Sequence, residues 1–172
     1  NGDDRGKVAR MRKAILTAQT EVDVPVEAAR DWFLSLQEHP ERYTFETHEG
    51  FEFEQGSFGE DGARFTTRER FFFLKLGLHF ELTEVREASF RFSLARPSSI
   101  GVWGRFEIEE GNEAGSRLSL AIGSETRAGQ LLLRCYPVAA AVYRQIHQEV
   151  RHIKRSMEKV YARGATRGGR DD

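Results

Sequence analysis

One stretch near the C-terminus, from Gln130 to Tyr161, constrains the fold more than any other part of the chain. Its apolar residues recur at steps of three or four, which is the spacing of one face of an α-helix. They are Leu131, Cys135, Val138, Val142, Ile146, Val150, Ile153, Met157 and Val160. The positions between them are mostly Arg, Lys, Glu and Gln, so the opposite face should see water. Such a helix would be about 46 Å long, enough to cross a domain of this size.

Pro137 interrupts this pattern, and two arrangements are open. An internal proline costs about 3 kcal/mol, whereas burial of each apolar side chain contributes roughly 1.5–3 kcal/mol. We therefore expect one long helix with a kink at Pro137. Alternatively, Ala128 to Tyr136 forms a separate short helix and Pro137 lies in the first turn of the main one. The run Ala139 to Ala141 either lets the sheet approach closely, which we favour, or leaves space beside the helix.

Composition narrows the class of protein. The chain has 172 residues, the length of one domain with its own core. Its net charge of −1, from 26 basic and 27 acidic residues, argues against a dedicated nucleic-acid surface. Cys135 is the only cysteine, so no intramolecular disulfide can form, and we expect a cytoplasmic location. We find no stretch that resembles a membrane span or a signal peptide.

The domain is expected to cover residues 14–162, between two polar ends. Residues 1–13 form a basic lead with five Lys and Arg residues, and residues 163–172 form a tail that we expect to be disordered. We interpret both basic ends as solvated. The alternative is that they contact anionic lipid or another chain.

The rest of the chain reads as strands with two short helices. Alternation predicts a strand from Leu16 to Val24, and helical spacing follows from Val26 to Leu36. A second short helical segment is expected at residues 38–42. Turn signals then recur about every ten residues, and strands joined by such short loops form an antiparallel meander. The expected strands are residues 43–48, 51–55, 63–76, 78–86, 89–95, 102–109 and 117–126, with Gly77 as a tight turn.

Apolar residues fall on one face of this predicted sheet. They are Phe80, Leu82, Phe90, Phe92, Leu94, Phe106, Ile108, Leu118, Leu120 and Ile122, whereas residues such as Arg91 and Arg105 alternate with them. A one-sided sheet needs a cover, and the C-terminal helix is the only element long and apolar enough. The consecutive residues Phe71 to Leu74 break the alternation, which a bulge or a contact in a homodimer would explain.

This order of elements resembles the START/SRPBCC superfamily, whose helix-grip fold occurs in lipid-transfer domains, pollen allergens and polyketide cyclases. Residues 20–33, TEVDVPVEAARDWF, look like the opening of that superfamily, a strand that ends in a proline before a helix with an aromatic residue. Residues 153–158, IKRSME, resemble its usual helix ending. The resemblance implies an α+β fold, a curved antiparallel sheet of about six to seven strands wrapped around a long C-terminal helix. It also implies a hydrophobic cavity between sheet and helix.

No familiar catalytic or metal-binding motif is present. None of the five histidines has ligand spacing, since His147 and His152 lie about 140° apart around a helix. The glycines at 56, 59 and 62 lack the Lys-Ser/Thr pair and the following helix of a phosphate-binding loop. We therefore expect no metal and no cofactor, and the sequence leans against an enzyme.

The candidate ligand-binding residues are those that could line the cavity. Rings on strands suit a flat, apolar ligand, although each ring can equally fill the core. Tyr143 and His147 are neighbours on one flank of the helix, where they could orient a ligand carbonyl or transfer a proton. The alternative is that they are boundary residues, with the ring buried and the polar end in solvent. The set is Trp32, Phe33, Phe65, Phe80, Phe92, Phe106, Tyr136, Tyr143, His147 and Glu69.

Three functions remain open at this point. The leading hypothesis is a domain that binds a hydrophobic small molecule, such as a lipid, sterol or polyketide. The second is an enzyme of the cyclase or aromatase kind that uses Tyr143 with His147 or Glu69. The third is an interaction module without a ligand, in which Phe71 to Leu74 or the basic ends contact a partner.

Overall fold

The computed structural model describes residues 15–71, 74–112 and 114–168. Seven strands, three α-helices and short 3₁₀ turns follow one another along this part of the chain. In order they are β1 (Ile15–Val22), α1 (Val26–Leu34), η1 (Ser35–Gln37), η2 (Pro40–Tyr43), β2 (His48–Gln55), β3 (Arg64–Phe71), β4 (Leu74–Arg86), β5 (Ser89–Arg96), η3 (Ser98–Ile100), β6 (Val102–Glu110), β7 (Ser116–Ser124), α2 (Arg127–Arg134) and α3 (Tyr136–Gly168).

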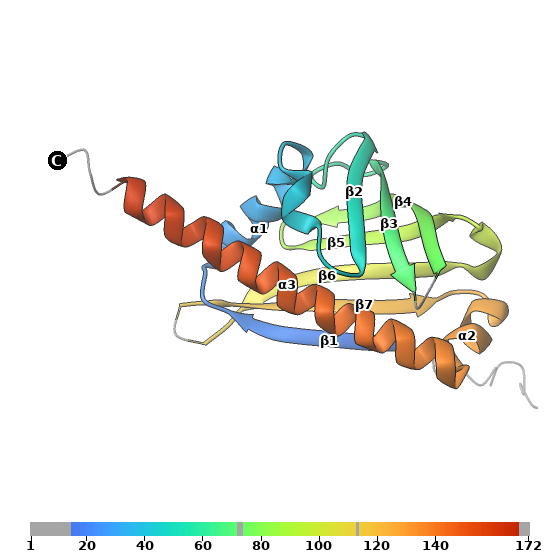
Figure 1. The fold of residues 1–172 in the computed structure, drawn as a ribbon. Coiled ribbons are helices and arrows are strands. Elements are labelled where there is room, and N and C mark those ends of the chain that lie inside the picture. The colour runs from blue at the N-terminus through green and yellow to red at the C-terminus, as the bar shows by residue number, and fades with distance from the viewer. Residues whose placement is uncertain (1–14, 72–73, 113, 169–172) are drawn as a thin grey trace, which may run out of the picture.

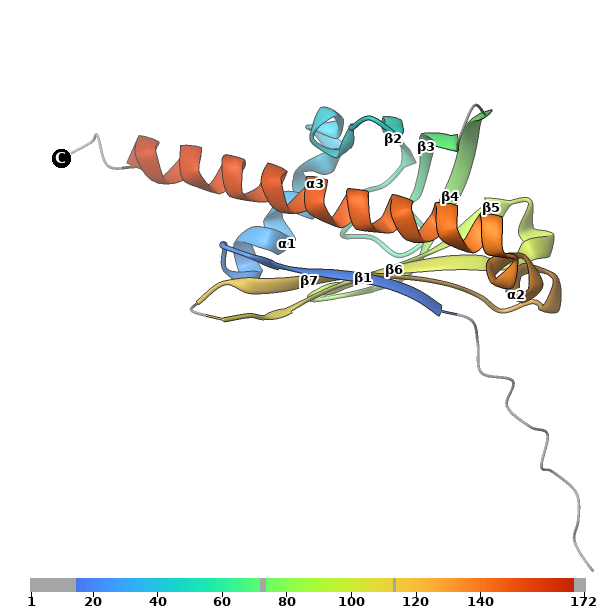
Figure 2. The same ribbon diagram turned by 60° about the horizontal axis from the view of Figure 1, so that its bottom comes forward.

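The strands form one antiparallel sheet in the order β1-β7-β6-β5-β4-β3-β2. The sheet curves around α3: β1, β7 and β6 lie below the helix, and β2, β3 and β4 rise behind it (Figures 1 and 2). The predicted α+β helix-grip architecture is confirmed. No helix in the described part of the chain is long and apolar enough to span a membrane.

The concave face of the sheet carries the apolar residues that alternation predicted. Leu82, Phe90, Phe106, Leu118 and Leu120 are all nearly inaccessible to solvent. The apolar stripe of α3 packs into the same core through Ile146, Val150, Ile153 and Met157. Burial of these side chains is the main favourable term in the folding of the domain.

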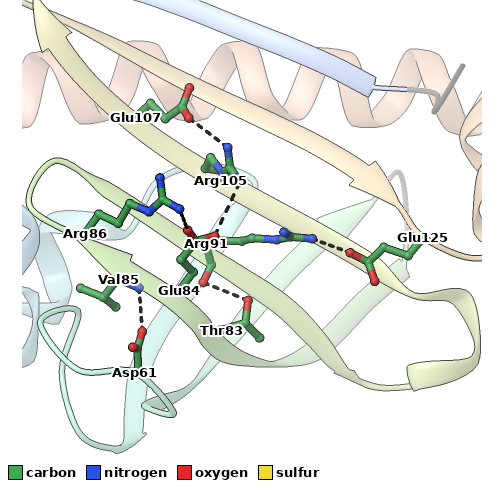
Figure 3. A network of polar contacts seen from close by, with 9 residues as sticks. All are labelled: Asp61, Thr83, Glu84, Val85, Arg86, Arg91, Arg105, Glu107 and Glu125. Carbon is green, nitrogen blue, oxygen red and sulfur yellow. Dashed lines mark hydrogen bonds and ion pairs between the residues drawn. The ribbon is translucent and has the colours of Figure 1, made fainter.

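The convex face is polar, as the same alternation requires (Figure 3). The guanidinium group of Arg91 pairs with Glu125 and lies over the ring of Trp103, 5.1 Å from its centre. Arg105 pairs with Glu107 and Glu84. The prediction that Arg91 points outward is therefore confirmed, and this residue is not available to the interior.

The helical conformation is interrupted between α2 and α3. The prediction of one long helix with a kink at Pro137 is therefore wrong. Cys135 adopts an extended backbone conformation after α2, and α3 starts at Tyr136 with Pro137 in its first turn. This is the alternative left open above; proline is tolerated there because the first N–H groups of a helix have no partner within it. Cys135 is exposed rather than part of the core.

The C-terminal end of α3 also differs from the expectation. The helix runs to Gly168, so the disorder predicted from residue 163 is wrong as far as residue 168. Once a helix is formed, it extends one residue at a time at little cost. Residues 1–13 of the basic lead and residues 169–172 lie outside the described residues.

The turn predicted at Gly77 is also wrong. β3 ends at Phe71 and pairs there with Leu74, the first residue of β4, while Gly77 lies within β4 opposite Arg68. Glycine suggested a turn, whereas the aromatic run carried no turn signal. Residues 72 and 73, between the two strands, lie outside the described residues, so the bulge or dimer contact expected at Phe71 to Leu74 stays a prediction.

Gly104→Ala should destabilise the fold, because a Cβ at this position would collide with the ring of Phe92 on the neighbouring strand. We expect a loss of about 1–3 kcal/mol, measured as a lower midpoint of urea unfolding. Gly77→Ala is the matched control, since nothing lies within 4 Å of its Cβ position. It should be neutral or slightly stabilising. Equal losses in both variants would contradict this account of the packing.

Candidate functional site

A cavity of about 130 Å³ lies between the concave face of the sheet and α3. Side chains from β2 to β7, from η2 and from α3 surround it, along with Phe58 of the loop after β2. Rings and aliphatic groups make up most of the wall, and polar groups are gathered on α3, η2, β2 and β3. The lining residues are Tyr43, His48, Phe58, Phe65, Thr67, Glu69, Leu78, Phe80, Phe92, Val102, Phe106, Ile122, Val142, Gln145, Ile146 and Glu149.

The aromatic part of the wall is one continuous group of rings. Phe65 and Phe80 stack with their centres 5.2 Å apart on paired positions of β3 and β4. Phe92 contacts Phe80 edge-on at 5.3 Å and Phe106 at 5.6 Å. These residues share a face because each occupies an inward position on its strand. The wall therefore presents rigid apolar surface to whatever occupies the cavity.

The polar lining is a buried cluster that joins three segments of the chain. Gln145 and Glu149 are four residues apart on α3 and therefore neighbours on one flank of the helix. The hydroxyl of Tyr43 donates to Glu149, and Nε2 of Gln145 donates to Oε2 of Glu69 at 2.8 Å. All four side chains are at least nine-tenths buried. These contacts tie η2 and β3 to the helix.

His48 completes this cluster on the first position of β2. Its Nδ1 lies 2.8 Å from Oε1 of Glu69, close enough for an ion pair, although the ring N–H is not directed well enough to hydrogen-bond to the oxygen. Nε2 of His48 and the hydroxyl of Thr67 have no hydrogen-bond partner among the described residues. Buried polar atoms are normally bonded, so both are candidates to contact a ligand or a water molecule.

Burial changes the acidity of the cluster. It raises the pKa of Glu149 from 4.5 to about 7; the charge of Glu69 acts in the same direction, while His48 and the bond from Tyr43 oppose it. Burial, together with the charge of Glu149, also raises the pKa of Tyr43 well above its usual value. Near neutral pH the Glu149 carboxyl is therefore divided between its protonated and ionised forms.

The structure brings together half of the residues predicted for the site. Phe65, Phe80, Phe92, Phe106 and Glu69 line the cavity, and their part in binding remains a proposal.

Trp32 and Phe33 of α1 lie in the core but not along the cavity. The indole N–H of Trp32 donates to Ser156 at 3.1 Å, and Phe33 packs against Phe58, Phe90 and Phe106. Both residues fix α1 against its neighbours, so their contribution to the cavity is indirect.

The expected position of Tyr136, Tyr143 and His147 at the inner edge of α3 is wrong. Tyr136 is 83% exposed and Tyr143 is 51% exposed, and none of the three lines the cavity. Tyr143 and His147 do contact each other, with ring centres 4.3 Å apart, but on another flank of the helix. Because each residue turns the helix by about 100°, Tyr143 points away from the cavity that its neighbour Val142 faces.

Sequence reasoning missed Tyr43, His48, Thr67, Gln145 and Glu149. Gln145 and Glu149 were predicted to lie on the solvent-exposed face of the helix because they are polar. Their positions beside Val142 and Ile146, at helical spacing, were the signal that could have placed them inward. Tyr43 and His48 lie where the chain leaves a 3₁₀ turn and enters a strand, a segment without periodicity. In the described part of the chain, no group of three or more His, Cys, Asp or Glu residues is placed to hold a metal ion.

The raised pKa of Glu149 makes stability depend on pH. The folded protein keeps this proton up to about pH 7, whereas the unfolded chain loses it near 4.5, so stability falls as pH rises between these values. The loss is about 3 kcal/mol at most. Glu149→Gln keeps an acceptor for Tyr43 but carries no charge, and should gain stability relative to the natural protein as pH rises.

Urea midpoints across this pH range measure that gain, and Glu52→Gln on the exposed face of β2 is the control. A difference between Glu149→Gln and the natural protein that does not change with pH would show that the carboxyl is ionised throughout.

Comparison with known proteins identifies the fold. No family model and no curated protein sequence matches the chain. Among solved structures, the KanY protein is similar with a TM-score of 0.68 and 13% identity, covering 86% of this chain and 99% of KanY. TTHA0849 from Thermus thermophilus has a TM-score of 0.68 and 15% identity, with the same coverage of 86% and 99%.

Ara h 8.0201 is similar with a TM-score of 0.63 and 12% identity, over 84% of this chain and 97% of its own. In each case the likeness extends over nearly the whole of the other protein. The chain therefore shares the helix-grip fold of these three proteins, the fold that the resemblance in its sequence had indicated.

Proposed function

We propose that this protein binds an apolar small molecule with a polar group in the cavity between its sheet and α3. The observation that carries the proposal is the combination of a wall of rings with a buried polar cluster at the same cavity. Ligand sites are typically mostly apolar with a few convergent polar groups. A simple packed core would have no need for two carboxylates, which are costly to bury.

The volume of the cavity favours a ligand about the size of one aromatic ring. Pockets for larger ligands usually measure about 300–1,000 Å³, and an apolar cavity of about 150 Å³ holds benzene. At about 130 Å³, this cavity is close to the size that holds benzene. Among the classes expected from the sequence, a sterol or a long lipid would need the helix to move away from the sheet. A small cyclic compound fits the arrangement as it stands.

The ligand would enter past the partly exposed residues of the lining. Leu78, Val102, Ile122 and Val142 are partly exposed, whereas Phe58, Phe65 and the polar cluster are buried. The apolar part of a ligand would lie among the rings, and its polar part would reach Thr67 and His48. Each polar atom that gains a partner would remove a cost of about 1–3 kcal/mol.

Val142→Phe should abolish binding by placing a ring in the cavity while the helix is kept. Native mass spectrometry, with organic extraction of whatever the purified protein carries, should show a bound small molecule in the natural protein and none in the variant. Tyr143→Phe, one residue along and half exposed, should leave the bound mass unchanged. Retention of the ligand by Val142→Phe, or a natural protein that neither carries nor binds any ring-sized compound, would overturn the proposal.

A second candidate function is acid–base catalysis on a ligand in this cavity. It is favoured by the hydrogen bond between Tyr43 and Glu149, together with the raised pKa of Glu149 near 7. A carboxyl with a pKa near the working pH is suited to take up and return a proton. The sequence-based assignment to Tyr143 and His147 is replaced by Glu149 and Tyr43, because only the latter pair reaches the cavity.

Catalysis of this kind predicts proton exchange on a ring-sized ketone. With cyclohexanone in deuterated buffer, NMR should show faster exchange of the hydrogens beside the carbonyl when the protein is present. Glu149→Gln should lose at least tenfold of this rate, and His147→Ala should lose none. Exchange that survives in Glu149→Gln would remove Glu149 as the base, and the absence of any exchange would leave binding as the sole activity of the cavity.

Other expectations stay predictions. A homodimer, contact of the basic ends with anionic membrane and a cytoplasmic location have no direct support from the fold. Leu131 and Tyr136 expose apolar surface at 73% and 83%, which is compatible with the interaction module considered above. Leu74, in the segment where the sequence suggested a contact, is also exposed, at 53%.

A further inference from the structure

We propose that the ligand is a small organic cation, a ring-sized compound with a protonated amine that lies against the carboxylates of Glu69 and Glu149. This inference rests on the proposed function, because it names the chemical class of the ligand for the same cavity. It follows from three properties of the lining: its balance of charge, its balance of hydrogen-bond donors and acceptors, and its aromatic faces.

When Glu149 is ionised, the charges of the cluster do not balance within the described residues. The ionisable groups that face Glu149 are Tyr43 from η2, His48 from β2 and Glu69 from β3. The lining has two carboxylates but only one side chain that can carry a positive charge, His48, and this lies 2.8 Å from Glu69, so the charge of Glu149 has no partner of opposite sign among the lining residues. Glu69 is 7% exposed and Glu149 is 8% exposed, so water does little to compensate it. A buried charge is stable only when it is paired, and a cation in the cavity would pair this one.

The hydrogen-bonding capacity of the cluster points the same way. Two carboxylates offer four oxygens, whereas the donors already directed at them are the hydroxyl of Tyr43 and the amide of Gln145. The two carboxylates therefore offer more acceptor oxygens than there are donors directed at them. An ammonium group brings three donors and no acceptor, which complements this arrangement. A ligand carbonyl would bring these carboxylates only a further acceptor, and would instead suit the hydroxyl of Thr67.

The aromatic wall suits a cation as well as an apolar ring. The ring of Tyr43 lies in the cluster itself, with its centre 6.4 Å from that of Phe106. Tyr and Phe faces attract ammonium groups, and the attraction is larger where water is excluded. The carbon skeleton of such a ligand would remain among Phe65, Phe80 and Phe92, whose rings form the rest of the wall.

Three probes of similar shape distinguish a cationic ligand from a neutral polar one and from an apolar one. They are benzylamine, benzyl alcohol and toluene. Isothermal titration calorimetry at about pH 8, where benzylamine is protonated, should show benzylamine binding at least tenfold tighter than either neutral probe. Glu69→Gln should remove most of that preference. Glu52→Gln, with an equal change of net charge on the outside of β2, should leave it intact.

If Glu69→Gln does not fold, the pH dependence of benzylamine binding to the natural protein tests the same inference. Lowering the pH from about 8 to about 6 protonates Glu149, so the affinity for benzylamine should fall severalfold while that for benzyl alcohol stays constant. Folding of each variant is checked by circular dichroism.

The outcomes of these experiments distinguish a failure of the cationic-ligand inference from a failure of the proposed binding function. Neutral probes that bind as tightly as benzylamine would overturn the cationic ligand and leave the proposed function in place. Benzylamine binding that Val142→Phe does not weaken would place the amine outside the cavity and overturn the inference. Failure of all three probes to bind the natural protein would overturn the proposed function for ring-sized ligands, and this inference with it.

Discussion

The fold depends on the burial of the apolar stripe of α3 against the concave face of the sheet. α3 packs most closely along β1, at one edge of the sheet, while β2, β3 and β4 curve up on its other side (Figure 2). A single helix cannot fill the whole of a sheet that curves this strongly. α1 fills one end with Trp32 and Phe33, and the space that neither helix reaches is the cavity. The cavity is thus a consequence of the geometry that stabilises the domain.

The break at Cys135 decides how the other end is closed. Thr126 caps α2 by accepting from the N–H of Gly129, and Gly129 lies so close to the carbonyl of Ile100 that a Cβ would collide with it. Glycine is required there because the helix meets the backbone of η3 directly. α2 consequently packs against β7 and η3 at the end of the sheet, next to the strands that carry Val102 and Ile122 of the lining.

The buried cluster is the feature that packing alone does not explain. Tyr43, Gln145 and His48 offset part of the cost of burying two carboxylates, and the remainder is expressed in the raised pKa of Glu149. Apolar residues of similar size in these positions would usually give a protein that is as stable or more stable. Groups that break the rules of packing in this way are often found at functional sites, which is why the proposals of ligand binding and of proton transfer both centre on this cluster.

The sequence by itself determined the fold class, the inward face of β4 to β7 and the apolar stripe of α3, because these follow from periods of two and 3.6 residues along the chain. Four of the rings and Glu69, which the sequence offered as candidates, line the cavity in the structure. Only the tertiary structure decided which flank of α3 faces the cavity, and it chose Gln145 and Glu149 over Tyr143 and His147. The helix period defines an apolar stripe. Whether a polar residue at the edge of that stripe can be buried depends on the hydrogen-bond partners in the segments packed against the helix. Here Glu69 and Tyr43 offer hydrogen bonds, and they come from segments 76 and 106 residues away along the chain.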